Sequence, residues 1–551
     1  MTASAKRALP WAIASVFQAY LTGVAAFSRD FAKLSVTILG VPLFVGEATI
    51  GILAVLLAAR TLKGRALPFP IDGVGKALAA YFAIGTGFAL FGLARHYGVA
   101  AVRDFALVYY LAFFFFTLAV VRLGIQPRTI IHAIAFGSVV GALVAVASYA
   151  IAPSLTFEHG APGYQAPAAW IGALWCCLLL PEAKRATSRA LLGAGATLTL
   201  VTIYLTGYRT MLPVMIVSLV VLWVWAIRGG GEDRRMWRGG AWVASGAVGV
   251  FMLGIATHTL TMTAPDHPVP VNGRVEFSDG LKVLSSRWVR GFKLLAPTVI
   301  QVIREGQDKA AVEDSLTFRL DAWGKAFDSI KASPLTGIGF GPAPALYPEL
   351  FCDAPYSPTS NCGNAHNTFI TLAMRMGIPV FLLFSGINLA ILAKFLRSGL
   401  RASSSMWPAV VSPFLAATYV SLLLYAGMSL FFESPYLSPL YWIVLGLMHV
   451  GSSSPGGSQD GPLRTEEDPR VGETPTPGGR LTSTSRFGQR TWRPFILDIR
   501  FLIPGCQGLK KISSPKRGHW TPFRTPDRGR PRPRWLAPIA GLPRSAIGVF
   551  E

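Results

Sequence analysis

Charged side chains are scarce in this sequence. Only 14% of its 551 residues are Asp, Glu, Lys or Arg, whereas 52% are hydrophobic. A soluble globular protein carries about 25% charged residues. The scarcity therefore excludes a chain that lies mostly in water. Acidic residues are the scarcer kind, since 28 Asp and Glu stand against 51 Lys and Arg and leave a net charge of +23.

Long stretches lack charged residues altogether. Ile130 to Ala152 and Trp242 to Ala256 contain no Lys, Arg, Asp or Glu. The first stretch is long enough to cross a hydrocarbon layer of about 30 Å as a helix. Its apolar residues are continuous rather than alternating, which favours helices over a barrel. The sequence thus predicts an all-α integral membrane protein.

We predict about twelve transmembrane helices, nine of them before one long polar segment and three after it. Their predicted ranges are 9–27, 38–59, 76–94, 102–121, 129–151, 166–181, 190–206, 210–227, 239–258, 367–394, 407–431 and 436–450.

Lys and Arg are unevenly distributed among the segments that connect these spans. If the N-terminus is cytoplasmic, the short inner segments hold 18 Lys and Arg and the short outer segments hold 5. Basic residues concentrate on the cytoplasmic side of membrane proteins. The distribution therefore predicts that both termini are cytoplasmic and that the long polar segment 259–366 lies outside.

Four regions follow from this topology. Residues 1–258 hold helices one to nine, and residues 367–450 hold helices ten to twelve. Residues 259–366 are longer than a connection needs and predict a helical periplasmic loop domain. Residues 451–551 carry 17 Lys and Arg against 8 Asp and Glu and are rich in Gly, Pro and Ser. Such a composition cannot bury enough apolar surface to fold, so we predict a disordered basic cytoplasmic tail.

Metal ligands are lacking in the outer loop. It has no Asp-x-Asp pair and no His/Cys set with ligand spacing, so we predict no metal and no cofactor. Cys352 and Cys362 lie on the oxidising side of the membrane, where a bond between them would contribute about 2 to 3 kcal/mol. The sequence leaves open whether this disulfide forms.

The end of the outer loop contains two local patterns. Apolar residues at helical spacing from Leu316 to Ile330 predict an amphipathic helix, which ends before Pro334 and has Arg319 beside its apolar stripe. The segment PLTGIGFGP at 334–342 follows. It lacks the Lys-Ser/Thr of a phosphate loop and therefore favours a tight turn.

Two more residues are candidates for a functional role. His366 opens a span in the segment HNTFI, and Arg209 lies in TGYRT between two spans. A single His at a helix start is usually a cap or an interfacial ring, and an Arg at a span end can extend to the interface. Neither residue indicates catalysis by itself.

In their order, these features resemble the O-antigen ligase and polymerase family. TGYRT, a large outer loop, FRLDAW, PLTGIGFG and HNTFI follow one another as in that family, and the resemblance is most specific from Arg319 to Pro379. It implies a metal-independent glycosyltransferase of the all-helical, lipid-carrier-dependent type. Such an enzyme acts in lipopolysaccharide or polysaccharide biosynthesis, at the periplasmic face of the bacterial inner membrane.

The resemblance also implies site residues. His366 would be the catalytic base, supported by Asn367, and Arg209 and Arg319 would bind the pyrophosphate of an undecaprenyl-pyrophosphate-linked glycan. Guanidinium groups and an imidazole suit the cleavage of a sugar to pyrophosphate bond. The sequence departs from the family at Arg375, where many relatives have an acidic residue. We expect Arg375 to support the site as a further phosphate contact.

Several alternatives stay open. Transfer to a lipid A core is favoured over polymerisation of O-antigen or exopolysaccharide, which uses the same donor and extends a growing glycan. A lipid-linked sugar flippase or polysaccharide transporter would need charges near the bilayer midplane, for which Glu47 and Arg375 are candidates. A membrane scaffold for a glycan synthase is a third possibility. We expect membrane lipids and no nucleic acid as partners.

Overall fold

Almost every residue that the structure describes is helical. The computed structural model describes residues 3–38, 41–62, 72–151, 165–206, 210–228, 238–246, 248–249, 314–341, 346, 365–401, 410–429, 431–432 and 434–452. All of them belong to the first of two contact units, Met1–Leu463. The predicted tail at 451–551 therefore lies, apart from its first two residues, outside the described part of the chain.

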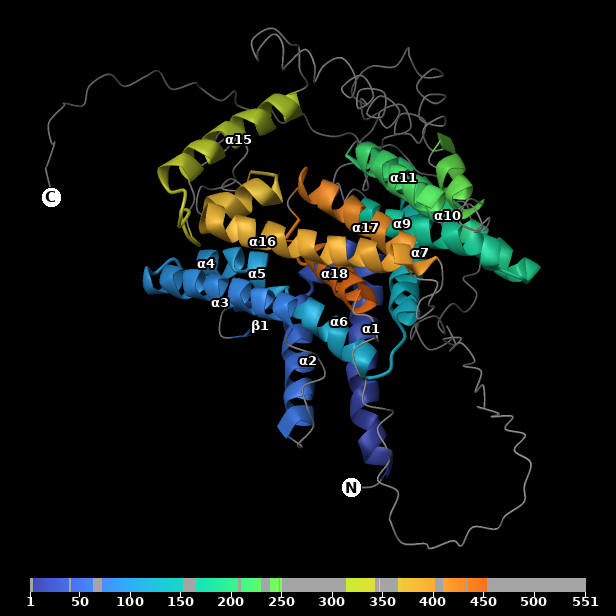
Figure 1. Ribbon diagram of the computed structural model, residues 1–551, viewed down its shortest axis with the longest axis horizontal. Helices are drawn as coiled ribbons and strands as arrows, with labels where there is room; N and C mark the ends of the chain where they lie inside the picture. The colour runs from blue at the N-terminus through green and yellow to red at the C-terminus, as the bar shows by residue number, and fades with distance from the viewer. Residues whose placement is uncertain are drawn as a thin grey trace, which may run out of the picture. The chain divides into compact units, whose positions relative to one another are not determined.

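The elements follow one another along the chain as Figure 1 shows. They are α1 (Ala3–Lys33), β1 (Ser35–Ile38), β2 (Val41–Phe44), α2 (Val45–Leu62), α3 (Gly73–Ala94), α4 (Val99–Asp104), α5 (Ala106–Tyr109), α6 (Ala112–Arg122), α7 (Pro127–Ile151), α9 (Ala166–Leu179), η2 (Leu180–Glu182), α10 (Ala186–Thr206), α11 (Met211–Arg228), α15 (Asp314–Ala332), α16 (Thr368–Arg401), α17 (Val411–Ala426) and α18 (Ser438–Ser452).

Seven helical segments of the described chain are long and apolar enough to cross a membrane. They overlap the predicted spans 9–27, 38–59, 76–94, 102–121, 129–151, 190–206 and 367–394, and three shorter apolar helices overlap 166–181, 210–227 and 407–431. The chain is a multi-pass, all-α membrane protein. The number twelve, the orientation and the four region boundaries stay predictions.

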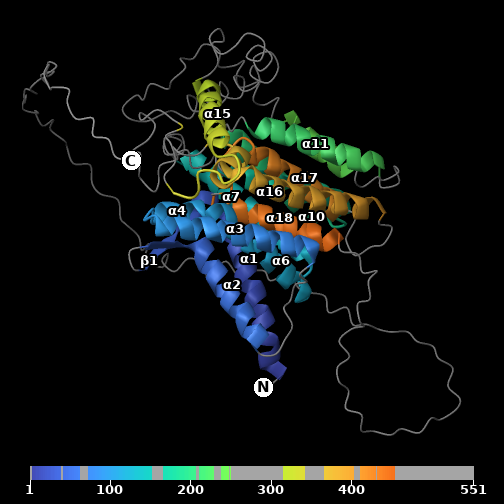
Figure 2. The same ribbon diagram turned by 60° about the vertical axis from the view of Figure 1, so that its left-hand side comes forward.

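The buried centre of this unit consists of α9, α17 and α18. Every side chain of α9 is buried, and α9 contacts α7, α10 and α17, while α18 contacts α6, α16 and α17. Trp170 of α9 donates hydrogen bonds to the hydroxyls of Ser218 and Ser421, at 3.1 and 3.3 Å. Apolar side chains gain little from leaving lipid for a neighbouring helix, so such polar contacts help to fix which helices pack together. The long helix α16 lies against α18 and α3 in both views (Figure 1, Figure 2).

The structure departs from the predicted helices at two places. The predicted span 38–59 begins late, because β1 and β2 form an antiparallel hairpin and α2 starts only at Val45. The run Val36, Thr37 and Ile38 is β-branched, which favours a strand.

The predicted span 102–121 is divided into α4, α5 and α6. The hydroxyls of Tyr109 and Tyr110 both donate to one carboxylate oxygen of Glu47. Consecutive residues of a regular α-helix point about 100° apart. Both tyrosines reach the same oxygen where α5 ends, so the interruption of the helix accompanies this contact. The division between α4 and α5 leaves Asp104 at the end of the short helix α4.

Candidate active site

His366 lies directly before the first turn of α16. Its φ of 48° is in the left-handed region, which is uncommon for a residue with a side chain. Two contacts hold the chain on either side of it. The indole nitrogen of Trp323 donates to the carbonyl oxygen of Ala365 at 2.7 Å. The side-chain oxygen of Asn367 accepts from the backbone N–H groups of Phe369 and Ile370 at 3.0 and 3.2 Å.

Asn367 is therefore the N-cap of α16, because its side chain satisfies two of the N–H groups that a helix start leaves open. The position of His366 at a span start made it a possible cap. The structure gives the capping role to Asn367 and leaves the imidazole of His366 partly buried beside the helix start.

Arg319 of α15 lies near enough to this site for its charge to act on His366. The alanines Ala322 and Ala326 and the side chain of Ile330 form the buried face of α15, and they pack against Ala373 and Met374 of α16. This packing brings α15 alongside the beginning of α16 (Figure 2).

Burial and the nearby charge of Arg319 both disfavour a protonated His366. Burial is the larger cause and the positive charge of Arg319 the second, and together they lower the pKa of His366 from 6.5 to about 4. The imidazole is consequently neutral at pH 7. A neutral imidazole next to a guanidinium can accept a proton from a hydroxyl while the guanidinium binds an anion.

The segment between Pro334 and Gly341, which we call the glycine loop, packs backbone to backbone against a kink in α16. Within α16, Gly377 has a φ of 83°, and Pro379 has no N–H for the carbonyl of Arg375. The N–H of Ile378 turns away to the carbonyl of Pro334, at 2.8 Å. The kink thus leaves the carbonyls of two α16 residues without their usual helical donors.

The glycine loop supplies both missing donors. The N–H of Ile338 donates to the carbonyl of Met374 and that of Gly339 to the carbonyl of Arg375, each at 2.9 Å. Gly337 has a φ of 63°, and a Cβ there would lie 2.6 Å from the backbone of Arg375. The predicted tight turn is confirmed. Gly337 is explained by this close backbone approach, and Gly339 and Gly341 by their positive φ of 80° and 133°.

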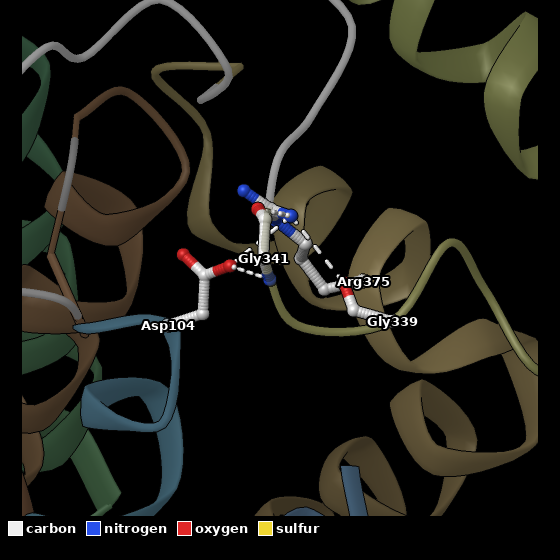
Figure 3. A network of polar contacts seen from close by, with 4 residues as sticks. All are labelled: Asp104, Gly339, Gly341 and Arg375. Atoms are coloured by element: carbon white, nitrogen blue, oxygen red, sulfur yellow. Dashed lines mark hydrogen bonds and ion pairs between the residues drawn. The ribbon is translucent and has the colours of Figure 1, made fainter. Parts of the chain in front are cut away.

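The side chain of Arg375 folds onto the same loop, as Figure 3 shows. Its Nη1 donates to the carbonyls of Gly341 and Gly339, at 2.7 and 3.3 Å, and pairs with Asp104 Oδ2 at 3.1 Å. Asp104 Oδ2 also accepts the N–H of Gly341 at 2.8 Å. Both charged side chains are buried, so the pair joins α4, the glycine loop and α16 at one point.

The family model described as O-antigen ligase matches residues 194–385. Over these residues, which we call the ligase domain, the chain is similar to the O-antigen ligase family. The ligase domain contains α15, the glycine loop and the first half of α16, and therefore both His366 and Arg319. No curated protein matches the chain.

Three of the predicted site residues lie at or near the start of α16. His366 and Asn367 directly precede the helix, and Arg319 is near enough for its charge to act on His366. Arg375 lies further along α16, and its guanidinium is directed at Asp104 and the glycine loop. Arg209, Cys352 and Cys362 lie outside the described residues. Their roles stay predictions.

Among the residues that the structure describes, no cluster of three or more His, Cys, Asp or Glu side chains is positioned to hold a metal ion. Metal independence of the reaction stays a prediction.

Two residues of this region were missed by sequence reasoning. Trp323 was assigned only to an apolar stripe, although its indole N–H fixes the residue before His366. Asp104 was not singled out, although it is the buried partner of Arg375. A signal for Asp104 was present, because an acidic residue near the end of an apolar span usually has a cationic partner.

Proposed function

We propose that this chain transfers a glycan from undecaprenyl pyrophosphate to an acceptor hydroxyl, with a lipid A core as the acceptor, at the periplasmic face of the inner membrane. The proposal is supported by the placement of a largely buried His366 just before α16, where burial and the nearby charge of Arg319 lower the pKa of the imidazole. The similarity of residues 194–385 to the O-antigen ligase family supports a lipid-linked glycan as the substrate.

The two side chains would divide the reaction between them. His366 takes the proton of the acceptor hydroxyl while the hydroxyl oxygen forms a bond to the anomeric carbon of the donor sugar. The bond between that carbon and the pyrophosphate oxygen breaks, and the leaving group departs with the electron pair. Arg319, together with Arg209, stabilises the negative charge on the pyrophosphate through paired N–H donors.

Donor binding would also adjust the base. A pyrophosphate on Arg319 compensates the positive charge that helps to lower the pKa of His366. An anion beside an imidazole favours its protonated form. The pKa of His366 therefore rises when the donor is bound, which makes the imidazole a stronger base in the complex than in the free protein.

The experiment is a gel assay of the purified protein with an undecaprenyl-pyrophosphate-linked oligosaccharide, with and without lipid A core. The variant is His366→Asn, because Asn tolerates the left-handed φ of 48° better than Ala does. The matched control is His96→Asn, since His96 also has a positive φ of 62° but is exposed on another loop.

We expect a shifted lipid A band with the unchanged protein and with the His96 variant, and none with the His366 variant. Longer glycans on the carrier without lipid A would show a polymerase instead of a ligase. Full transfer by a correctly inserted His366→Asn protein would contradict the role of His366 as the base.

A further inference from the structure

The buried pair of Asp104 and Arg375 connects parts of the chain that are far apart in sequence. Asp104 ends α4, and Arg375 lies on α16 inside the ligase domain, which begins only at residue 194. Their 3.1 Å contact, together with the bond from the Gly341 N–H to Asp104, ties the glycine loop to the N-terminal helices. The glycine loop is itself bonded to the α16 kink.

The glycine loop also links the two site residues. It begins two residues after α15, the helix that carries Arg319, and it is bonded to α16, the helix that follows His366. A displacement of the loop would move α15 relative to the start of α16. The separation of Arg319 and His366 therefore depends on how firmly this loop is held.

Neutral side chains could also have joined α4, the glycine loop and α16 at this point. A buried ion pair is costly to desolvate and is retained where its geometry fixes one arrangement. Here one guanidinium nitrogen bonds two carbonyls of the loop and the Asp104 carboxylate at once. The arrangement leaves Arg375 engaged within the protein rather than directed at a substrate phosphate (Figure 3).

We propose that Asp104 and Arg375 are positioning residues, which hold the glycine loop so that Arg319 of α15 stays near His366, which precedes α16. The inference rests on the proposed function for its effect on glycan transfer. It replaces the expectation that Arg375 contacts phosphate.

The test compares Asp104→Asn with the double variant Asp104→Asn, Arg375→Met. The single variant leaves Arg375 buried without its counter-charge, whereas the double variant leaves no unpaired buried charge and recovers stability. The control is Asp328→Asn, which removes an exposed ion pair to Lys331 on α15. For each protein we would measure the melting temperature and the kcat and KM of glycan transfer. We would also measure the extent of His366 acylation by diethyl pyrocarbonate at a series of pH values, by mass spectrometry. The pH at half-maximal acylation is the midpoint for His366.

We expect kcat to fall about 10- to 100-fold in Asp104→Asn and in the double variant, because a misplacement of about 1 Å costs that much. KM should stay within about threefold. The double variant should regain most of the lost melting temperature. The midpoint of His366 acylation should move from about 4 toward the ordinary histidine value of 6.5 in both, because His366 loses part of its burial and the nearby charge of Arg319.

Recovery of full kcat along with melting temperature in the double variant would overturn the proposal, since the pair would then serve stability alone. An unchanged His366 midpoint in both variants would overturn it as well. If the unchanged protein transfers no glycan but the midpoint still moves in Asp104→Asn and not in Asp328→Asn, the positioning role stands and the proposed function fails.

Discussion

The protonation of His366 is controlled by two neighbours of different kinds. Burial acts on the charged imidazole through lost hydration, and Arg319 acts through its positive charge. Because the pKa is lowered to about 4, the neutral form persists well below pH 7. A reaction that needs neutral His366 should therefore keep its kcat/KM as the pH falls, until the pH approaches that value.

Arg319→Gln separates the two causes. It removes the charge but leaves the burial, so the pKa of His366 should rise part of the way toward 6.5 and the acidic limb of kcat/KM should move to higher pH. The pH dependence of kcat/KM measures this directly. Lys325→Gln on the same helix, where Lys325 pairs with Asp321 at 2.8 Å, is the matched control. An acidic limb at the same pH in Arg319→Gln and in the unchanged protein would show that Arg319 is not close enough to act on His366.

At the scale of elements, the α16 kink and the glycine loop depend on each other. Gly337→Ala should lower the free energy of unfolding by about 1 to 3 kcal/mol, because its φ is 63° and its new Cβ would lie 2.6 Å from the backbone of Arg375. Gly324→Ala on the exposed side of α15, where a Cβ meets nothing within 4 Å, should instead stabilise by about 0.5 to 1 kcal/mol.

Thermal unfolding of the detergent-solubilised proteins compares the two alanine variants. A melting temperature of Gly337→Ala equal to that of the unchanged protein would contradict the 2.6 Å approach of this position to the backbone of α16. Because the loop helps to place Arg319, the same variant should also lose kcat.

How much of these elements the sequence predicts depends on whether the information is local. The helix α15 and the turn after it follow from apolar spacing and from Pro334 and Gly337, which are local signals. The ion pair of Asp104 with Arg375 joins residues that several helices separate along the chain, and no local pattern encodes such a pairing. The β-hairpin before α2 was missed because an apolar run at a span start reads equally well as helix.

The same division applies to the site. The family's motif order gives His366 and Arg319 as candidates, and the structure explains why a residue on α15 can act on His366 at the start of α16. The sequence could not show that Asn367 caps α16 or that Trp323 fixes the residue before His366. Both contacts depend on side-chain direction, which residue spacing leaves open.

At the scale of the whole molecule, the proposed reaction requires that His366 face the periplasm. Three predicted spans, 190–206, 210–227 and 239–258, separate Lys184 from the α15 residue Asp328. An odd number of crossings places these two exposed positions on opposite sides of the membrane. With an inner Lys184, as the distribution of basic residues predicts, Asp328 lies outside.

Single cysteines at these two positions test the orientation and the span count together. In a background in which the five native cysteines are replaced by serine, Asp328→Cys should react with an impermeant maleimide in intact spheroplasts, and Lys184→Cys only after permeabilisation. Reaction of both from the same side would mean that an even number of spans separates them, so that the three predicted crossings between them are wrong in number. Reaction of Lys184→Cys alone would invert the topology, and His366 would then face the cytoplasm, where a periplasmic lipid A acceptor cannot reach it.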